Sequence, residues 1–186
     1  MYRAHAHAPL PAIAFATAVV LAGFPGTALA QKPDFSGTWQ LNVQASDDTE
    51  SQVLGGAGED ATRGITRLER GRLVERLIQL ARAIDEIEIA HSESDLVIAD
   101  REDNLRIYYL DGKKHARQTP WGAKLDAVAE WHGQQITVQT TGKEIGEVHE
   151  TFGLEGRQLV LIIRIKNENF ENEIVIRNNY DRLPAK

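Results

Sequence analysis

The stretch FSGTWQLN, residues 35–42, begins the first predicted β-strand of this chain. Residues 38–43 alternate in polarity and contain the β-branched and aromatic side chains that favour strands. An isolated strand is not stable, and the second half of the sequence supplies the partners that this one needs.

After residue 85 the sequence consists of short strand-like segments separated by turn signals such as Asp111-Gly112. Connections this short permit only antiparallel neighbours, and closure of the sheet removes its exposed edges. We therefore predict a mainly β fold, an antiparallel up-and-down barrel of about eight or nine strands. The predicted later strands are 86–89, 96–98, 105–110, 123–131, 135–140, 147–154, 159–165 and 173–182.

One helix is predicted after the first strand, over about residues 66–84, because its apolar side chains recur on one face at helical spacing. Residues 45–60, with Gly55, Gly56 and Gly58, are expected to form a mobile loop before it. The helix is rich in arginine, including Arg72 and Arg76. Two interpretations stay open: a solvated helix face, or contact with an anionic membrane surface or a partner.

The first thirty residues have the pattern of a signal peptide. Arg3 precedes an apolar run over 11–24, and Ala28-Leu29-Ala30 fits the small residues of a cleavage site. We expect export to the periplasm or beyond the cell after cleavage near Ala30, with a retained anchor as the alternative. Residues 31–186 then form a single barrel domain.

Composition excludes several classes of protein. The net charge of −6 argues against a nucleic-acid binder, and the absence of cysteine excludes disulfides and thiolate metal sites. The sequence has no G-x-S-x-G, P-loop or dinucleotide fingerprint and no histidines at metal-ligand spacing. It therefore predicts no metal, no cofactor and no common enzyme class.

Phe35-x-Gly37-x-Trp39 resembles the G-x-W signature of lipocalins and the F-x-G-x-W opening of intracellular fatty-acid-binding proteins. The resemblance implies a calycin barrel, with Trp39 as a plug at one end and a basic side chain from the last strand stacked on it. We assign that role to Arg182, which shares the parity of the inner face. The chain also resembles small exported bacterial proteins of lipocalin-like shape that have no assigned role.

The resemblance to fatty-acid-binding proteins does not extend to their carboxylate site. That family carries R-x-Y on its final strand, with both side chains directed into the cavity. Here the order is Arg177-Asn178-Asn179-Tyr180, and an offset of three places Arg177 and Tyr180 on opposite faces of a regular strand.

Strand parity predicts which side chains face the interior. Glu150 stands out, because a carboxylate on an apolar inner face must be paired, hydrogen-bonded or protonated. It is either a polar anchor for a ligand, a general acid or base, or a structural hydrogen-bond partner. The predicted inner faces are 105, 107 and 109; 125, 127, 129 and 131; 148, 150, 152 and 154; and 174, 176, 178 and 180. The candidate ligand-binding residues on them are Tyr109, Trp131, Glu150, Asn178 and Tyr180.

The basic segment at 111–121 is a further candidate. It carries Lys113, Lys114, His115 and Arg117 close to Trp121. It either recognises an anion at the barrel mouth or forms a solvated turn with Trp121 folded over the barrel end.

Three functions are compatible with this sequence. The first is an exported barrel that binds a small apolar or amphipathic ligand, such as a lipid. The second is a filled barrel that acts as an interaction module in the cell envelope. The third is a barrel isomerase or hydrolase that uses Glu150.

Overall fold

The structure, a computed structural model, describes residues 32–58, 64–102, 104–119 and 121–184. The expected signal peptide, residues 1–30, lies outside the described residues. Two helices and a short 3-10 turn follow the first strand: η1 (Val43–Ala45), α1 (Thr49–Gly56) and α2 (Arg67–Ala81). The strands are β1 (Gly37–Leu41), β2 (Glu86–His91), β3 (Asp95–Asp100), β4 (Leu105–Tyr109), β5 (Lys114–Gln118), β6 (Lys124–His132), β7 (Gln135–Gly142), β8 (Gly146–Glu155), β9 (Gln158–Lys166) and β10 (Ile174–Arg182).

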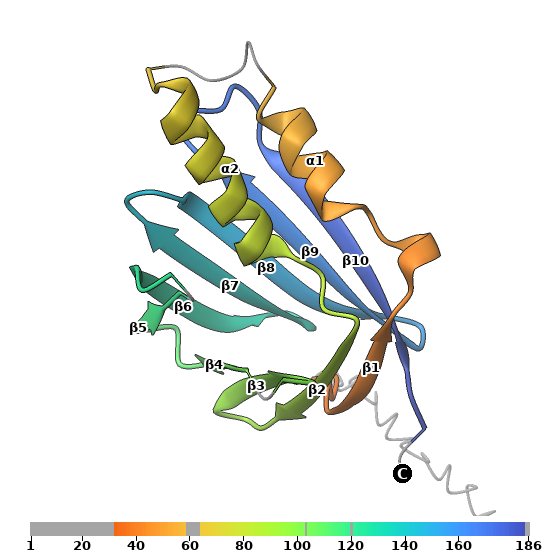
Figure 1. Cartoon of the computed structure of the whole chain (residues 1–186). Helices are drawn as coiled ribbons and strands as arrows, with labels where there is room; N and C mark the ends of the chain where they lie inside the picture. Colours follow the sequence, from red (N-terminus) through yellow and green to blue (C-terminus); the bar gives the residue numbers. More distant parts are fainter. Residues whose placement is uncertain (1–31, 59–63, 103, 120, 185–186) are drawn as a thin grey trace, which may run out of the picture.

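The strands form a single antiparallel sheet that curls into a nearly closed barrel (Figure 1). Its order is β4-β3-β2-β1-β10-β9-β8-β7-β6-β5, so the first strand pairs with the last and the sheet ends at β4 and β5. Curling brings β4 into contact with β6, and the amide of Gly112 donates to the carbonyl of Ala129 at 3.1 Å. The predicted mainly β, antiparallel barrel is confirmed.

The sheet has ten strands where the sequence predicts about eight or nine. The additional strand is β5, whose polar sequence Lys-His-Ala-Arg-Gln lacks an apolar alternation. It pairs with β6, for example Ala116 with Asp126. Its backbone pairing, rather than its hydropathy, makes it a strand.

The prediction of a loop over residues 45–60 is wrong, because α1 lies within it. Asp48 caps this helix by accepting a hydrogen bond from the amide of Ser51 at 2.8 Å. Val53 and Ala57 are fully buried. Gly56 lies against β10, where a Cβ atom would be 2.4 Å from Cγ1 of Ile174. Of the glycines that suggested a loop, Gly56 instead permits this close packing.

Helix α2 covers residues 67–81, within the predicted range of 66–84. Its first turn is closed by a capping box, in which Thr66 and Glu69 each bond the backbone amide of the other. The face with Leu73, Val74 and Leu77 is buried. Helices α1 and α2 lie side by side over one end of the barrel (Figure 1). In the described ranges, neither is long and apolar enough to cross a bilayer.

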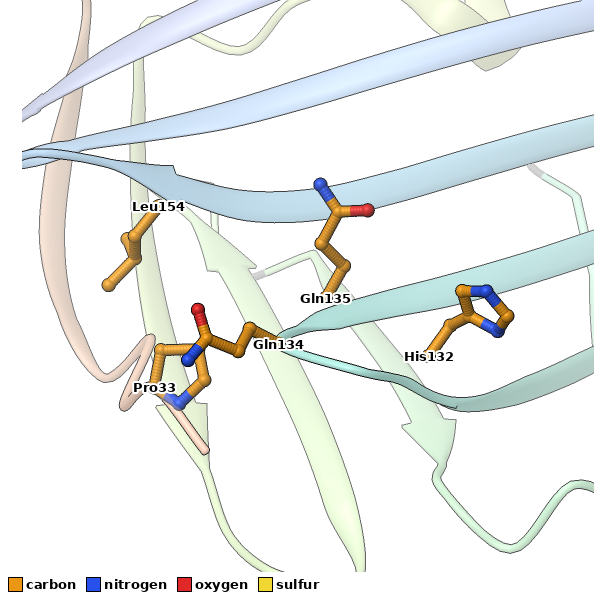
Figure 2. Close-up of a pocket in the computed structure, with 5 residues that line it drawn as sticks. All are labelled: Pro33, His132, Gln134, Gln135 and Leu154. Carbon is orange, nitrogen blue, oxygen red and sulfur yellow. The ribbon is translucent and has the colours of Figure 1, made fainter. Parts of the chain in front are cut away.

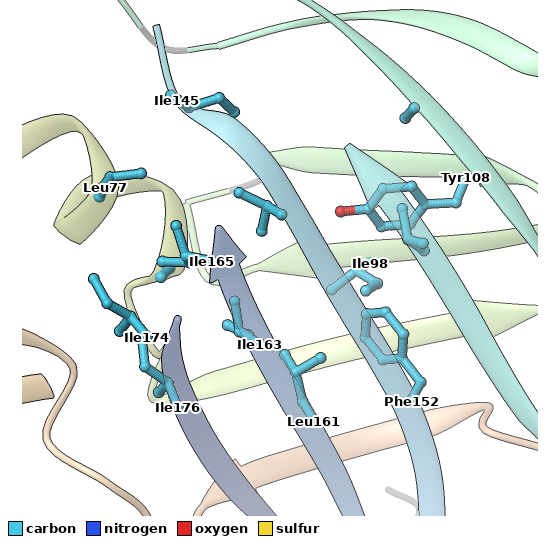
Figure 3. Packing of buried hydrophobic residues seen from close by; sticks show 14 of the residues in the cluster. Leu77, Ile98, Tyr108, Ile145, Phe152, Leu161, Ile163, Ile165, Ile174 and Ile176 are labelled. Carbon is cyan, nitrogen blue, oxygen red and sulfur yellow. The ribbon is translucent and has the colours of Figure 1, made fainter. Parts of the chain in front are cut away.

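The core fills the space between the helices and the inner face of the sheet (Figure 3). Strand β9 lies between β8 and β10, the central position that its apolar sequence predicts. Its inner face is buried from Leu159 to Ile165, and on its outer face Val160 is buried as well. Inner side chains such as Phe152 and Ile176 have no exposed surface. The barrel interior around these side chains is therefore closely packed.

Candidate functional site

The inner face of β4 carries Arg106 and Tyr108. These residues pair with Ile98 and Leu96 of β3, both fully buried, so all four side chains point inward. The prediction that residues 105, 107 and 109 face the interior is wrong: Leu105 is 61% exposed, and Tyr109, 47% exposed, packs against His115 with ring centroids 4.7 Å apart and the rings tilted by 44°. The hydropathy pattern predicted the wrong inner face for this strand because its inward side chains, Arg106 and Tyr108, are polar.

Glu150, on β8, lies inside the barrel and only 4% of it is exposed. The hydroxyl of Tyr108 donates a hydrogen bond to Glu150 Oε2 at 2.9 Å. Arg106 Nη1 lies 3.7 Å from Oε1, and Arg117 Nη1 lies 3.9 Å from Oε2. We refer to Arg106, Tyr108, Arg117 and Glu150 as the Glu150 cluster.

Arg117 joins this cluster from β5. Its Nη1 donates to the Tyr108 hydroxyl at 3.0 Å, and its guanidinium carbon lies 5.3 Å from the centre of the Tyr108 ring. The rest of the basic segment faces solvent or its own turn, since Lys114 pairs with Asp126 at 3.3 Å and His115 with Asp111 at 2.9 Å. Of the basic residues between 111 and 121, Arg117 is thus the one that enters the cluster.

The cluster has two cations and one carboxylate. Both guanidinium–carboxylate distances exceed hydrogen-bond length, so Glu150 does not fill the donors of either arginine. The side chains of Arg106 and Arg117 are 20% and 21% exposed, whereas that of Glu150 is 6% exposed. An anion that reached the cluster would therefore find open donors on both guanidinium groups.

The cluster also shifts the pKa values of its members. Burial, with the charge of Glu150 adding to it, raises the pKa of Tyr108 to about 12, so the phenol is a neutral donor at physiological pH. Burial disfavours the charge of Arg106, but attraction from Tyr108 and Glu150 outweighs that effect and raises its pKa. Arg106 is thus a permanent cation inside the barrel.

Sequence reasoning missed Arg106 and Tyr108, and it named Arg117 only as one member of the basic segment. The signal that points to them is Arg106-Ile107-Tyr108, whose spacing of two places both polar side chains on one face of a strand. An inward carboxylate at Glu150 needs such partners. Only the folded chain shows that β4 and β5 supply them.

Asn178 and Tyr180 lie together on the inner face of β10. Tyr180 is 2% exposed, and burial raises its pKa. Asn178 has no exposed surface, and neither atom of its amide has a hydrogen-bond partner in the described part of the chain. Arg177 points outward and donates a hydrogen bond to Glu155 at 2.6 Å. On the inner face of the final strand, the residue two positions before Tyr180 is therefore Asn178 and not an arginine.

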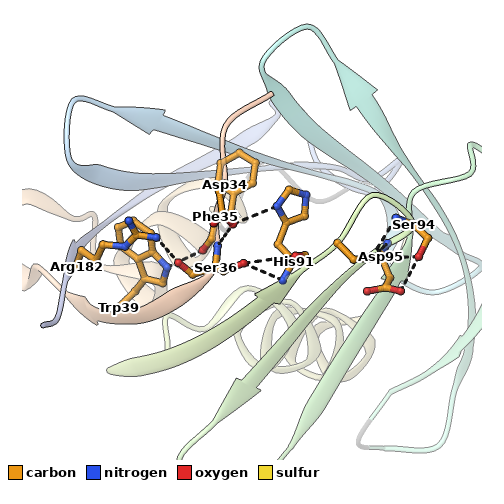
Figure 4. A network of polar contacts seen from close by, with 9 residues as sticks. Asp34, Phe35, Ser36, Trp39, His91, Ser94, Asp95 and Arg182 are labelled. Carbon is orange, nitrogen blue, oxygen red and sulfur yellow. Dashed lines mark hydrogen bonds and ion pairs between the residues drawn. The ribbon is translucent and has the colours of Figure 1, made fainter. Parts of the chain in front are cut away.

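Trp39 of β1 contacts both the segment before its own strand and the last strand (Figure 4). It is 1% exposed and donates from Nε1 to the carbonyl of Phe35 at 3.0 Å. The guanidinium carbon of Arg182 lies 4.9 Å from the centre of its ring, and Arg182 also donates to the carbonyl of Ser36. These contacts fasten residues 35–39 to the last strand.

Trp131 lies at the same end as Phe35. Its ring centroid is 5.9 Å from that of Phe35 and 5.3 Å from that of His91, and Lys32 Nζ lies 4.8 Å from it. The structure therefore places this candidate ligand-binding residue among the aromatic side chains near the plug.

A separate pocket of about 390 Å³ opens near the β6–β7 turn (Figure 2). No residue that lines it belongs to the Glu150 cluster, and none is among the ligand-binding residues predicted from the sequence. Its lining mixes turn amides with apolar groups: Pro33, His132, Gln134, Gln135 and Leu154. The described ranges contain no group of three or more side chains placed to hold a metal ion.

No model of a known protein family matches the chain, and no curated protein matches it. Solved structures do match its fold. The REP1-NXSQ fatty acid transporter superposes with a TM-score of 0.53 at 13% identity, over 81% of this chain and 97% of that one. Lipid binding protein 8 of Caenorhabditis elegans gives 0.52 at 15% identity, over 80% and 95%. The N57A mutant of the fluorescent protein UnaG gives 0.51 at 15% identity, over 81% and 97%. At such identities the likeness extends to the fold, and the chain has the lipocalin-like, calycin barrel fold that its Phe35-to-Trp39 signature predicts.

Proposed function

We propose that this protein binds a small amphipathic molecule with an anionic group inside its barrel. The observation that carries the proposal is the pair of inward guanidinium groups, Arg106 and Arg117, whose donors Glu150 does not fill. A buried cation without a full set of partners is costly, and a ligand anion would supply those partners.

The surroundings of the cluster suit an apolar tail. Val138 and Ile163 flank Glu150 on the neighbouring strands, and the Phe152 ring centroid lies 6.4 Å from that of Tyr108. Because Phe152 has no exposed surface, a long tail enters only when interior side chains change rotamer. Two of the similar structures are named as a fatty acid transporter and a lipid binding protein, which supports a ligand of this kind.

The cell envelope is the compartment that we propose for this binding. The proposal rests on the N-terminal sequence, where a basic residue, an apolar run and Ala28-Leu29-Ala30 follow in the order of a signal peptide. Mass spectrometry of the N-terminus of the exported protein would reveal cleavage near Ala30. An intact N-terminus in the cytoplasm would contradict export.

Ligand binding is tested first by native mass spectrometry of the protein purified from its own envelope, followed by extraction with organic solvent. We expect an added mass that solvent removes. Dodecanoate should then compete with a fluorescent fatty acid, and Arg106→Gln or Arg117→Gln should weaken the binding of both by about tenfold, the loss of one charge-assisted contact.

The control is Arg157→Gln, because Arg157 lies exposed in the turn between β8 and β9. This variant removes the same charge without altering the cluster and should bind like the wild type. An apo mass, with no saturable binding of either acid, would contradict the proposal.

Contact with an anionic membrane surface is a second candidate function. Leu68 of α2 is 65% exposed, and Arg72 follows one turn later on the face away from the core. An apolar side chain beside a cation is the pattern of a helix that rests on anionic lipid. We expect sedimentation with phosphatidylglycerol vesicles but not with phosphatidylcholine vesicles, and loss of that binding in a Leu68→Ser, Arg72→Glu variant.

A further inference from the structure

We infer that Glu150 determines which ligand charge the site prefers, so that the site selects an amphiphile with a single negative charge. This inference rests on the proposed function. Among the described residues, the charged side chains in contact with Glu150 are Arg106 and Arg117, each within 4 Å of the carboxylate. The Glu150 cluster thus has one positive charge in excess.

The other neighbours of Glu150 do not alter this balance. Tyr108 is neutral, because burial raises its pKa to about 12. The register partners of Glu150 on β7 and β9 are Val138 and Ile163, both apolar and buried. Tyr180 on β10 is also a phenol whose pKa burial raises. Asp100, at the end of β3, also attracts Arg106, but it lies in an exposed turn where water and salt screen its charge. The net charge inside the barrel therefore depends on two guanidiniums and one carboxylate.

Glu150 is held in place rather than free to leave. The hydroxyl of Tyr108 donates to Oε2 at 2.9 Å, and Arg117 in turn donates to that hydroxyl at 3.0 Å. Glu150 projects from a strand that is paired on both sides. An incoming anion must therefore share the two arginines with Glu150 and cannot simply replace it.

One negative charge on the ligand neutralises the excess positive charge of the Glu150 cluster. A neutral head group leaves one positive charge buried without a counter-ion, and a dianionic head group leaves one excess negative charge. Either imbalance is penalised in an interior of low dielectric constant. The site should thus discriminate by charge between head groups of the same shape.

Three amphiphiles with the same chain test this selectivity: dodecanol, dodecyl sulfate and dodecyl phosphate, each below its micelle concentration. Both esters are tetrahedral, but at about pH 8 the phosphate ester is a dianion, since its second pKa is about 6. We expect the wild type to bind dodecyl sulfate at least about tenfold more tightly than either of the others, measured by calorimetry.

Two variants change the cluster charge in opposite directions. Glu150→Gln raises the cluster charge to two, and the affinity for dodecyl phosphate relative to that for dodecyl sulfate should rise by at least about tenfold. Arg117→Gln lowers the cluster charge to zero, and the affinity for dodecanol relative to that for dodecyl sulfate should rise. Glu147→Gln is the matched control: this side chain lies on the outer face of the same strand, 50% exposed beside His149, and should leave both ratios unchanged.

The outcomes separate this inference from the proposed function. Saturable binding with ratios that neither variant changes would overturn the role of Glu150 and leave the proposed function intact. Failure of the wild type to bind any of the three would overturn the proposed function itself. Should Glu150→Gln fail to fold, the dodecanol-to-sulfate ratio of Arg117→Gln decides the matter.

Discussion

Arg117 on β5 donates a hydrogen bond to the hydroxyl of Tyr108 on β4 at 3.0 Å, although in the described ranges these two strands share no backbone ladder. Tyr108 in turn donates to Glu150 on β8 at 2.9 Å. A barrel whose sheet order ends at two edge strands needs some other connection between them. Here buried polar side chains provide that connection, and the same side chains form the candidate site.

Replacement of Tyr108 by phenylalanine should destabilise the fold. The variant loses a donor to a buried carboxylate and an acceptor for Arg117, and leaves Glu150 with less compensation. Hydrogen bonds to charged groups typically contribute about 1.5–3 kcal/mol, and we expect a loss of that size in the free energy of unfolding, measured in urea.

Tyr109→Phe is the control for this measurement. The Tyr109 side chain is 47% exposed on the opposite face of the same strand, so its hydroxyl is not part of the cluster. We expect a change within about 0.5 kcal/mol. Equal effects of the two substitutions would contradict the assigned parity of β4.

The fold should lose stability in alkali through Tyr108. Its pKa is raised from 10.0 to about 12 in the folded state, so the folded protein keeps a proton that the unfolded chain releases. The resulting stability is complete below pH 10 and is lost as pH rises towards 12. Two pKa units correspond to roughly 3 kcal/mol. Urea titrations across this range should show a shallower decline in Tyr108→Phe than in the wild type; parallel curves would argue against a buried Tyr108.

Gly55 and Gly56 should respond in opposite directions to replacement by alanine. At Gly56 the new Cβ would lie 2.4 Å from Cγ1 of buried Ile174, and overpacking of this kind costs about 1–3 kcal/mol. At Gly55 no atom apart from its chain neighbours and its own helix backbone lies within 4 Å of the new methyl group, and alanine gains about 0.5–1 kcal/mol in a helix. Thermal unfolding of the pair tests whether α1 packs on β10; two stabilised variants would show that it does not.

Arg182→Ala should weaken the contact between β10 and residues 36–39. It removes the cation over Trp39 and the hydrogen bond to the carbonyl of Ser36. We expect a loss of about 1–2 kcal/mol, detected by urea unfolding followed through tryptophan fluorescence. Arg157→Ala, at an exposed position, should change the stability by less than about 0.5 kcal/mol. A neutral effect of Arg182→Ala would mean that the plug is held by burial of Trp39 alone.

The sequence by itself determined the class of the fold. Alternation of side chains, short turns and the Phe35-to-Trp39 stretch predict an antiparallel barrel, because these signals act within or between adjacent segments. Helix α2 is predictable for the same reason, since its apolar face and its Thr66–Glu69 cap are local. The inward position of Glu150 also follows from its parity with Val148 and Phe152.

Only the tertiary structure decided which side chains contact Glu150. Tyr108 lies 42 residues away along the chain, and it faces inward although hydropathy favours its neighbours Ile107 and Tyr109. Helix α1 likewise depends on a distant partner, because Gly56 packs on Ile174. Strand β5 is polar and is a strand only through its backbone pairing with β6, in which Arg117 lies opposite Leu125. Buried charge is tolerated only where opposite charge comes within a few ångströms, and that proximity results from closure of the barrel rather than from any local pattern.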